Sequence, residues 1–83
     1  MITDISKLRV GDKVHYQPKH YGIDEWENGI IKEVPYFATN KDYFVVYNCI
    51  RVVYNCAGNW SNYMNYTSAL TNIDDLYLGW RHQ

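Results

Sequence analysis

Six aromatic side chains are the residues in this sequence best suited to hold a ligand. Three belong to the first predicted strand and its long loop, and three recur at intervals of three in a stretch from Val52 to Ile73 that has no charged side chain: Tyr16, Tyr21, Trp26, Trp60, Tyr63 and Tyr66. The chain holds nine Tyr but only two Phe. Because Tyr and Trp combine a flat ring with a polar atom, they suit stacking and hydrogen bonding at a surface. We therefore predict that these six rings form a binding patch.

The cysteines and histidines do not show the pattern of a reactive or metal-binding site. Cys49 and Cys56 are seven residues apart, and His15, His20 and His82 are scattered. Structural zinc sites use tighter spacings than these. Thiols within apolar strand sequences usually behave as inert core residues. We predict no catalytic residue, no metal and no cofactor.

The paired carboxylates are better explained by structure than by catalysis. Asp74 and Asp75 are adjacent, so they would point apart in an extended segment and could cap backbone amides in a helical turn. Glu25 and Glu27 could share one face of a strand or line a loop. The five glycines are isolated and form no phosphate-binding loop. The sequence therefore does not predict an enzyme.

Charge and hydropathy limit where the protein acts. The formal net charge is −1, from eight basic and nine acidic residues, so no broad field for polyanions is expected. The first residues lack the basic stretch and apolar run of a signal peptide. No segment approaches the roughly 20 apolar residues of a membrane span. With two cysteines and no secretion signal, the sequence predicts a cytoplasmic protein with reduced thiols and no membrane contact.

Short strands separated by turns account for most of the chain. Strands are predicted where β-branched and aromatic residues gather between turn residues, at 13–16, 30–34, 43–49, 66–71 and 76–80. Asn72 with Asp75 three residues later predicts a short capped turn before the last strand. Five strands, a long first loop and this turn predict one all-β domain over residues 1–83, an SH3-like five-stranded barrel.

A tandem repeat interrupts this pattern. The residues Val45–Cys49, Val-Val-Tyr-Asn-Cys, recur unchanged as Val52–Cys56. Because strand side chains alternate with period two, an offset of seven places equivalent residues on opposite faces. One strand from Tyr43 to Cys56 would reach about 46 Å at roughly 3.3 Å per residue, too long for a small barrel. We predict an extended or bulged third strand, whose surplus folds back or pairs with another chain in a homodimer.

Several segments together resemble small uncharacterised proteins encoded by bacteriophages and prophages. They are Val10–Tyr16, Glu27–Glu33, Phe44–Cys49 and Asp75–Arg81. The first hairpin, Val10–Val14 followed by Asn28–Val34, also resembles that of KOW- and Tudor-type domains. The resemblance implies an SH3-like barrel, a viral origin and the cytoplasm of a bacterial host. It brings no catalytic motif.

Two functions remain open for such a non-catalytic binding module. One is binding or sequestering a nucleotide or short nucleic acid, because aromatic rings stack on bases while Asn, Ser and Thr contact their edges. The near-neutral charge argues against long nucleic acids. The other is a protein-interaction or inhibitor module acting on a host protein, because Tyr and Trp dominate interface hot spots. An aromatic cage for a methylated cation, flanked by Asp24 or Glu25, is a variant of this second function.

Overall fold

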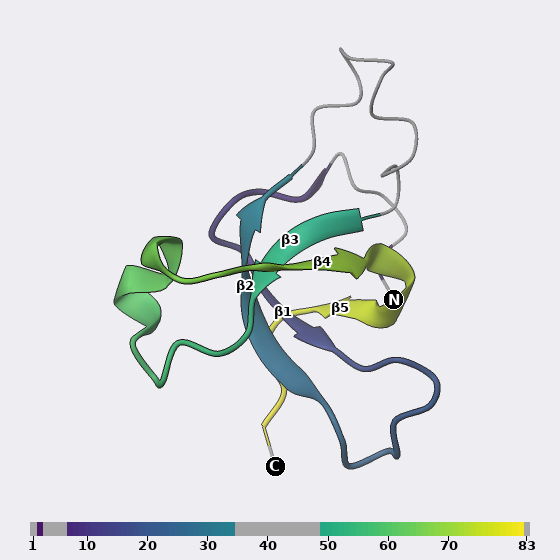
Figure 1. Ribbon diagram of the computed structural model, residues 1–83. Helices are drawn as coiled ribbons and strands as arrows, with labels where there is room; N and C mark the ends of the chain where they lie inside the picture. The colour runs from purple at the N-terminus through teal and green to yellow at the C-terminus, as the bar shows by residue number, and fades with distance from the viewer. Residues whose placement is uncertain (1, 3–6, 35–48, 83) are drawn as a thin grey trace.

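Alternating apolar residues build a single antiparallel sheet (Figure 1). A computed structural model describes residues 2, 7–34 and 49–82. The strands are β1 (Lys13–Tyr16), β2 (Glu27–Glu33), β3 (Cys49–Val53), β4 (Ala69–Asn72) and β5 (Leu76–Leu78). Their order across the sheet is β4-β3-β2-β1-β5, so among the described residues β4 and β5 are the two edges and no pairing closes the sheet. The predicted all-β fold with five strands is confirmed.

The strand boundaries differ from the predicted ones for local reasons. β2 begins three residues before the predicted Ile30, because Glu27 and Asn28 already pair with Tyr16 and His15 of β1. β5 ends at Leu78, and the next residue, Gly79, has a φ of +83°, which lies outside the range of a regular strand. The predicted third strand falls largely on residues outside the described ones, and the observed β3 begins at its last residue, Cys49.

Two 3-10 helices connect strands in the C-terminal half. The predicted turn before the last strand is confirmed as η4 (Ile73–Asp75), where the Asn72 side chain accepts a hydrogen bond of 2.9 Å from the Asp74 amide. The second, η3 (Trp60–Asn65), was not predicted. Its signal was the spacing of three between aromatic residues, which is the period of a 3-10 helix.

The hydrophobic core lies on one face of the sheet. Each strand except β4 contributes aliphatic residues, and the segments before β1 and after β4 add others: Ile2, Leu8, Val14, Ile31, Ile50, Val52, Ile73 and Leu76. Tyr16, Val34 and Tyr54 are half-buried against this cluster. On the other face Ile30 pairs with Val53, and both are buried. This second burial is explained by η3, which packs against β2.

The second copy of the repeat forms the end of β3 and the turn that follows. Val52 and Val53 are fully buried on opposite faces, and Cys56 is buried in the turn. Ala57 and Gly58 there have φ values of +52° and +79°. The first copy, up to Asn48, lies outside the described residues. The register shift that is observed lies on β2 between Ile31 and Glu33.

None of the described helices is long and apolar enough to cross a membrane.

Candidate functional site

The long loop between β1 and β2 is held by two tight turns. The Tyr21 amide donates to the Pro18 carbonyl at 3.0 Å, and the Glu25 amide donates to the Gly22 carbonyl at 3.0 Å. The Gly22 amide in turn donates to Oε1 of Glu25 at 2.8 Å. These bonds fix Tyr21 and Glu25 beside the start of β2.

Three tyrosines form a cluster where the core meets the solvent. The Tyr16 ring makes an edge contact with Tyr21, with centroids 5.6 Å apart, and a tilted contact with Tyr54 at 5.8 Å. The Tyr54 hydroxyl lies 2.8 Å from Oγ1 of the buried Thr71. The Thr71 hydroxyl also reaches the Ala69 carbonyl at 3.2 Å, and either hydroxyl can be the donor between Tyr54 and Thr71. Tyr16, Tyr21 and Tyr54 are called the tyrosine cluster below.

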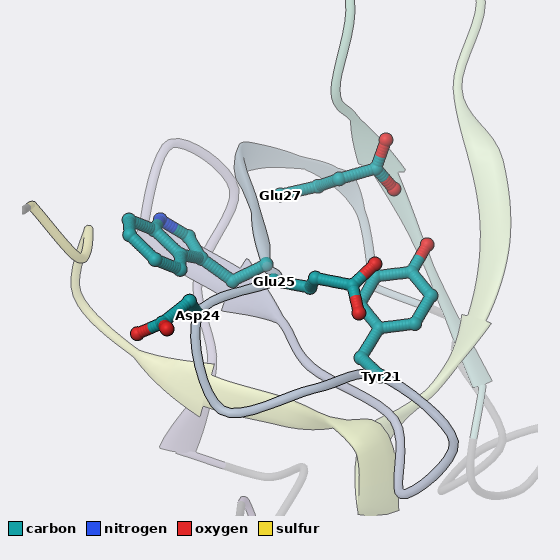
Figure 2. Close-up of a pocket in the computed structure, with 5 residues that line it drawn as sticks. Tyr21, Asp24, Glu25 and Glu27 are labelled. Atoms are coloured by element: carbon teal, nitrogen blue, oxygen red, sulfur yellow. The ribbon is translucent and has the colours of Figure 1, made fainter.

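Two adjoining pockets open beside the tyrosine cluster. The first, of about 390 Å³, is lined by residues of the β1–β2 loop and the start of β2: Tyr21, Asp24, Glu25, Trp26 and Glu27 (Figure 2). The second, of about 420 Å³, is lined by Tyr16, Glu27, Tyr54, Ala69, Leu70, Thr71, Asn72 and Asp75. Glu27 lines both, so we treat them as one acidic groove with two pockets.

The acidic groove carries concentrated negative charge. Four of its described lining residues are carboxylates, at positions 24, 25, 27 and 75, and none is basic. In Figure 2 the carboxyl groups of Glu25 and Glu27 lie on the same side as the Tyr21 ring, whereas that of Asp24 points away from it. A group placed between Tyr21 and Glu27 would therefore meet an aromatic ring and two negative charges.

Two tyrosines of the groove, Tyr21 and Tyr54, have a raised pKa. Desolvation raises the pKa of Tyr21, and the negative charge of Glu27 raises it further. Burial likewise raises the pKa of Tyr54, with Glu27 adding a smaller effect, while the hydrogen bond to Thr71 opposes the rise. The raised pKa keeps Tyr21 and Tyr54 protonated at neutral pH, so these two hydroxyls add hydrogen-bonding groups and no charge to the groove.

The C-terminal segment supports Trp26 from one side. The Arg81 guanidinium carbon lies 4.2 Å from the centroid of the Trp26 ring, and Trp26 Nε1 donates to the Arg81 carbonyl at 3.0 Å. Asn28 clamps the same residue: its amide nitrogen donates to the Arg81 carbonyl and its oxygen accepts from the Arg81 amide, both at 2.9 Å. Arg81 also donates to Oε1 of Gln17 at 3.0 Å. One ring of the groove thus already holds a guanidinium by a cation–π contact.

The six predicted binding residues fall into two groups. Tyr16, Tyr21 and Trp26 line the acidic groove. The other three lie in or directly after η3: Trp60, Tyr63 and Tyr66. Figure 1 shows η3 and the β1–β2 loop on opposite sides of the molecule.

The residues of the η3 group have structural partners. The Trp60 ring packs on Trp80 with centroids 4.8 Å apart, and Trp80 Nε1 donates to the Gly29 carbonyl at 2.8 Å. Lys32 Nζ donates to the Tyr66 carbonyl at 2.7 Å. The Tyr63 hydroxyl lies beside Gly11. These contacts hold η3 against the sheet.

Three groove residues were not singled out from the sequence as ligand-binding. Glu27 was considered only as half of a carboxylate pair, Asp75 only as a cap, and Tyr54 only as part of the repeat. For Glu27 and Tyr54, the alternation of side chains along a strand could have found them. Glu27 lies two residues before Gly29 and four before the core residue Ile31, so it shares their face of β2. Tyr54 follows Val52 by two and continues the same face of β3.

The chain matches no known protein family, no curated protein and no solved structure. No metal-binding group of three or more His, Cys, Asp or Glu side chains occurs among the described residues. The evidence on function therefore comes from the chemistry of the acidic groove.

Proposed function

We propose that this protein is a non-catalytic binding module that holds a positively charged segment of a partner protein in its acidic groove. The observation that supports it most is the gathering of four carboxylates around four aromatic rings, those of Trp26 and the tyrosine cluster. A Lys or Arg side chain there gains cation–π attraction of roughly 0.5–2 kcal/mol per good contact. Charge-assisted hydrogen bonds to carboxylates add to this attraction.

A protein partner fits this groove better than a nucleotide. A phosphate would be repelled by Glu27 and Asp75, which flank the tyrosine rings that would stack on its base. Nucleotide binding is the second candidate function, and one observation favours it at a different place on the molecule, beside η3. Lys13 Nζ lies 4.6 Å from the centroid of the Trp80 ring, which packs on Trp60, so these residues combine a cation with two aromatic rings.

The proposal extends to the fold and its origin. The meander β4-β3-β2-β1, the return of β5 to pair with β1, and the 3-10 turn η4 between β4 and β5 support an SH3-like barrel. The resemblance of several segments to phage-encoded proteins supports a host protein as the partner and the host cytoplasm as the place of action. Pairing of two chains through the repeat remains a part of the proposal.

The test is a titration of the purified protein, followed by tryptophan fluorescence, with octa-arginine, octa-glutamate and a panel of mononucleotides. We expect octa-arginine to bind and the other two not to, with an affinity that falls as salt is raised. Glu27→Gln should weaken octa-arginine binding about three- to fivefold, which corresponds to the upper range of an exposed ion pair.

The matched control is Glu33→Gln, which removes the same charge from an exposed residue at the other end of β2. Equal effects of the two substitutions would mean that octa-arginine responds only to net charge, and the proposal would fail. Saturable binding of a mononucleotide, lost in Trp60→Ala and retained in Tyr21→Ala, would favour the second candidate function.

A further inference from the structure

We propose that the acidic groove takes its partner as an extended segment that adds a strand to the edge of β4. In this arrangement a basic side chain occupies the first pocket beside Glu27, and an aliphatic side chain two positions away occupies the second pocket. The inference rests on the proposed function and specifies what kind of segment the groove selects.

The position of β4 supports strand addition. β4 is an edge of the sheet, and within the described part of the chain only β3 pairs with it. Edge strands leave alternate backbone N–H and C=O groups without partners, and extended peptides bind to such edges. All four residues of β4, Ala69–Asn72, line the second pocket. A segment seated in that pocket therefore lies alongside the open edge.

The two pockets differ in chemistry. The first offers two aromatic rings with three carboxylates, which suits an ammonium or a guanidinium. The apolar part of the second is formed by the Tyr16 and Tyr54 rings with Ala69, which pairs with the buried Val52 and so lies on the same face of the sheet. An aliphatic side chain placed there covers apolar surface that water now contacts.

The shared residue Glu27 sets the spacing between the two side chains. Because the pockets adjoin at one residue, they accept side chains that project from the same side of the bound segment. In an extended chain such side chains are two residues apart, roughly 6.5–7 Å. The carboxylates complement a basic segment. The expected motif is therefore basic–any–aliphatic, or the same residues in the opposite order.

The decisive experiment is an amide NMR titration with three capped heptapeptides of identical composition. They are acetyl-Gly-Ser-Arg-Thr-Leu-Ser-Gly-amide, its form with Arg and Leu exchanged, and a form with Arg and Leu adjacent. One of the two spaced peptides should bind at least fivefold more tightly than the adjacent one. Shifts should concentrate at β4 and Glu27. Equal affinities for the three peptides would overturn the inference.

N-methylation tests the contribution of the backbone. Strand addition engages every second residue of the bound segment, so single N-methyl groups should alternate between a loss of fivefold or more and little effect. An N-methyl scan without this alternation would contradict strand addition.

Two protein variants test the apolar pocket. Ala69→Asp should abolish the preference of the groove for Leu over Ala in the better peptide, because Ala69 lies on the pocket face of β4. Leu70→Asp is the matched control, because Leu70 is the next residue of β4 and pairs with the exposed Arg51 on the opposite face, so it should leave the preference unchanged. If both variants kept the preference, the aliphatic pocket would be refuted.

The outcomes separate the two proposals. If octa-arginine binds but the heptapeptides do not bind, or bind without regard to order, the cation-binding function stands and the strand-addition inference fails. If neither octa-arginine nor any heptapeptide binds, both fail.

Discussion

Replacing Gly29 with Ala tests whether the packing between β2 and β3 shapes the acidic groove. A Cβ at this position would lie 2.6 Å from Cγ1 of Val52, 2.9 Å from the Val53 carbonyl oxygen and 2.9 Å from Cδ1 of Tyr54. One neighbour is backbone, and another is a fully buried β-branched side chain with little freedom to move. Gly29→Ala therefore has to displace the Tyr54 ring or separate the two strands.

The magnitude follows from two opposing effects. Overpacking of a well-packed core costs typically about 1–3 kcal/mol. Replacing Gly with Ala restricts the unfolded chain and returns about 0.4–1 kcal/mol. The free energy of unfolding should therefore fall by about 1–2 kcal/mol. For a domain of this size each kcal/mol lowers Tm by roughly 4–8 °C, so we expect a decrease of roughly 5–15 °C.

The assay is thermal unfolding followed by circular dichroism, with Gly22→Ala as the matched control. A Cβ at Gly22 would lie 2.9 Å from Oε1 of Glu25, the movable end of an exposed side chain, so that variant should change Tm much less. If the Tm of Gly29→Ala lay within 2 °C of that of the unchanged protein, the argument that tight packing between β2 and β3 positions the Tyr54 ring would be refuted. A folded Gly29→Ala variant should also bind octa-arginine more weakly, because its Tyr54 ring is displaced.

Four further outcomes are expected. Tyr54→Phe removes the hydrogen bond to Thr71 and should lower the free energy of unfolding by about 0.5–1.5 kcal/mol, measured by urea denaturation at neutral pH. Burial raises the pKa of Tyr54 above its ordinary value of 10.0, so the folded state favours the protonated phenol. The stabilisation of the fold that this gives is complete below pH 10 and is lost as the pH rises above 10. The alkaline loss of Tm should therefore be smaller in Tyr54→Phe than in the unchanged protein. Ala57→Gly should leave Tm unchanged or raise it by a few degrees. The φ of +52° costs Ala roughly 1–2 kcal/mol in the folded protein, whereas the extra freedom of Gly in the unfolded chain costs about 0.5–1 kcal/mol. A clear decrease in Tm would contradict the strained turn. Iodoacetamide on the native protein should modify the half-buried Cys49 before the buried Cys56, as read by peptide mass spectrometry, and the reverse order would refute the observed burial.

Local sequence signals predicted most of the sheet. The alternation in Lys13–Tyr16 and the Asn72 cap depend on residues close together in the chain, and both are observed. Four of the strands and the turn before the last strand follow from such signals, whereas β3 shares only Cys49 with the predicted third strand. The start of β2 did not, because its first three residues join the ladder only through pairing with β1. Where pairing with a neighbouring strand decides the end of a strand, the residues at that end carry no local sequence signal for it.

The grouping of the aromatic residues required the three-dimensional structure. Tyr16, Tyr21 and Trp26 are close in sequence, and they remain together in the acidic groove. Tyr54 reaches them only because β3 lies beside β2 and Gly29 leaves room for its ring. No spacing within the chain encodes that approach.

Two of the nine tyrosines, Tyr16 and Tyr54, have two roles in this small domain. The rings of Tyr16 and Tyr54 extend the aliphatic core at the end of the sheet, where Phe would serve equally well for burial. Their hydroxyl ends lie at a groove that Glu27 makes acidic, and Phe would offer no hydrogen-bonding group there. The residues that complete the core therefore also line the acidic groove. Substitutions in the tyrosine cluster should change stability and ligand affinity together, whereas substitutions at Glu27 should change affinity with little effect on stability.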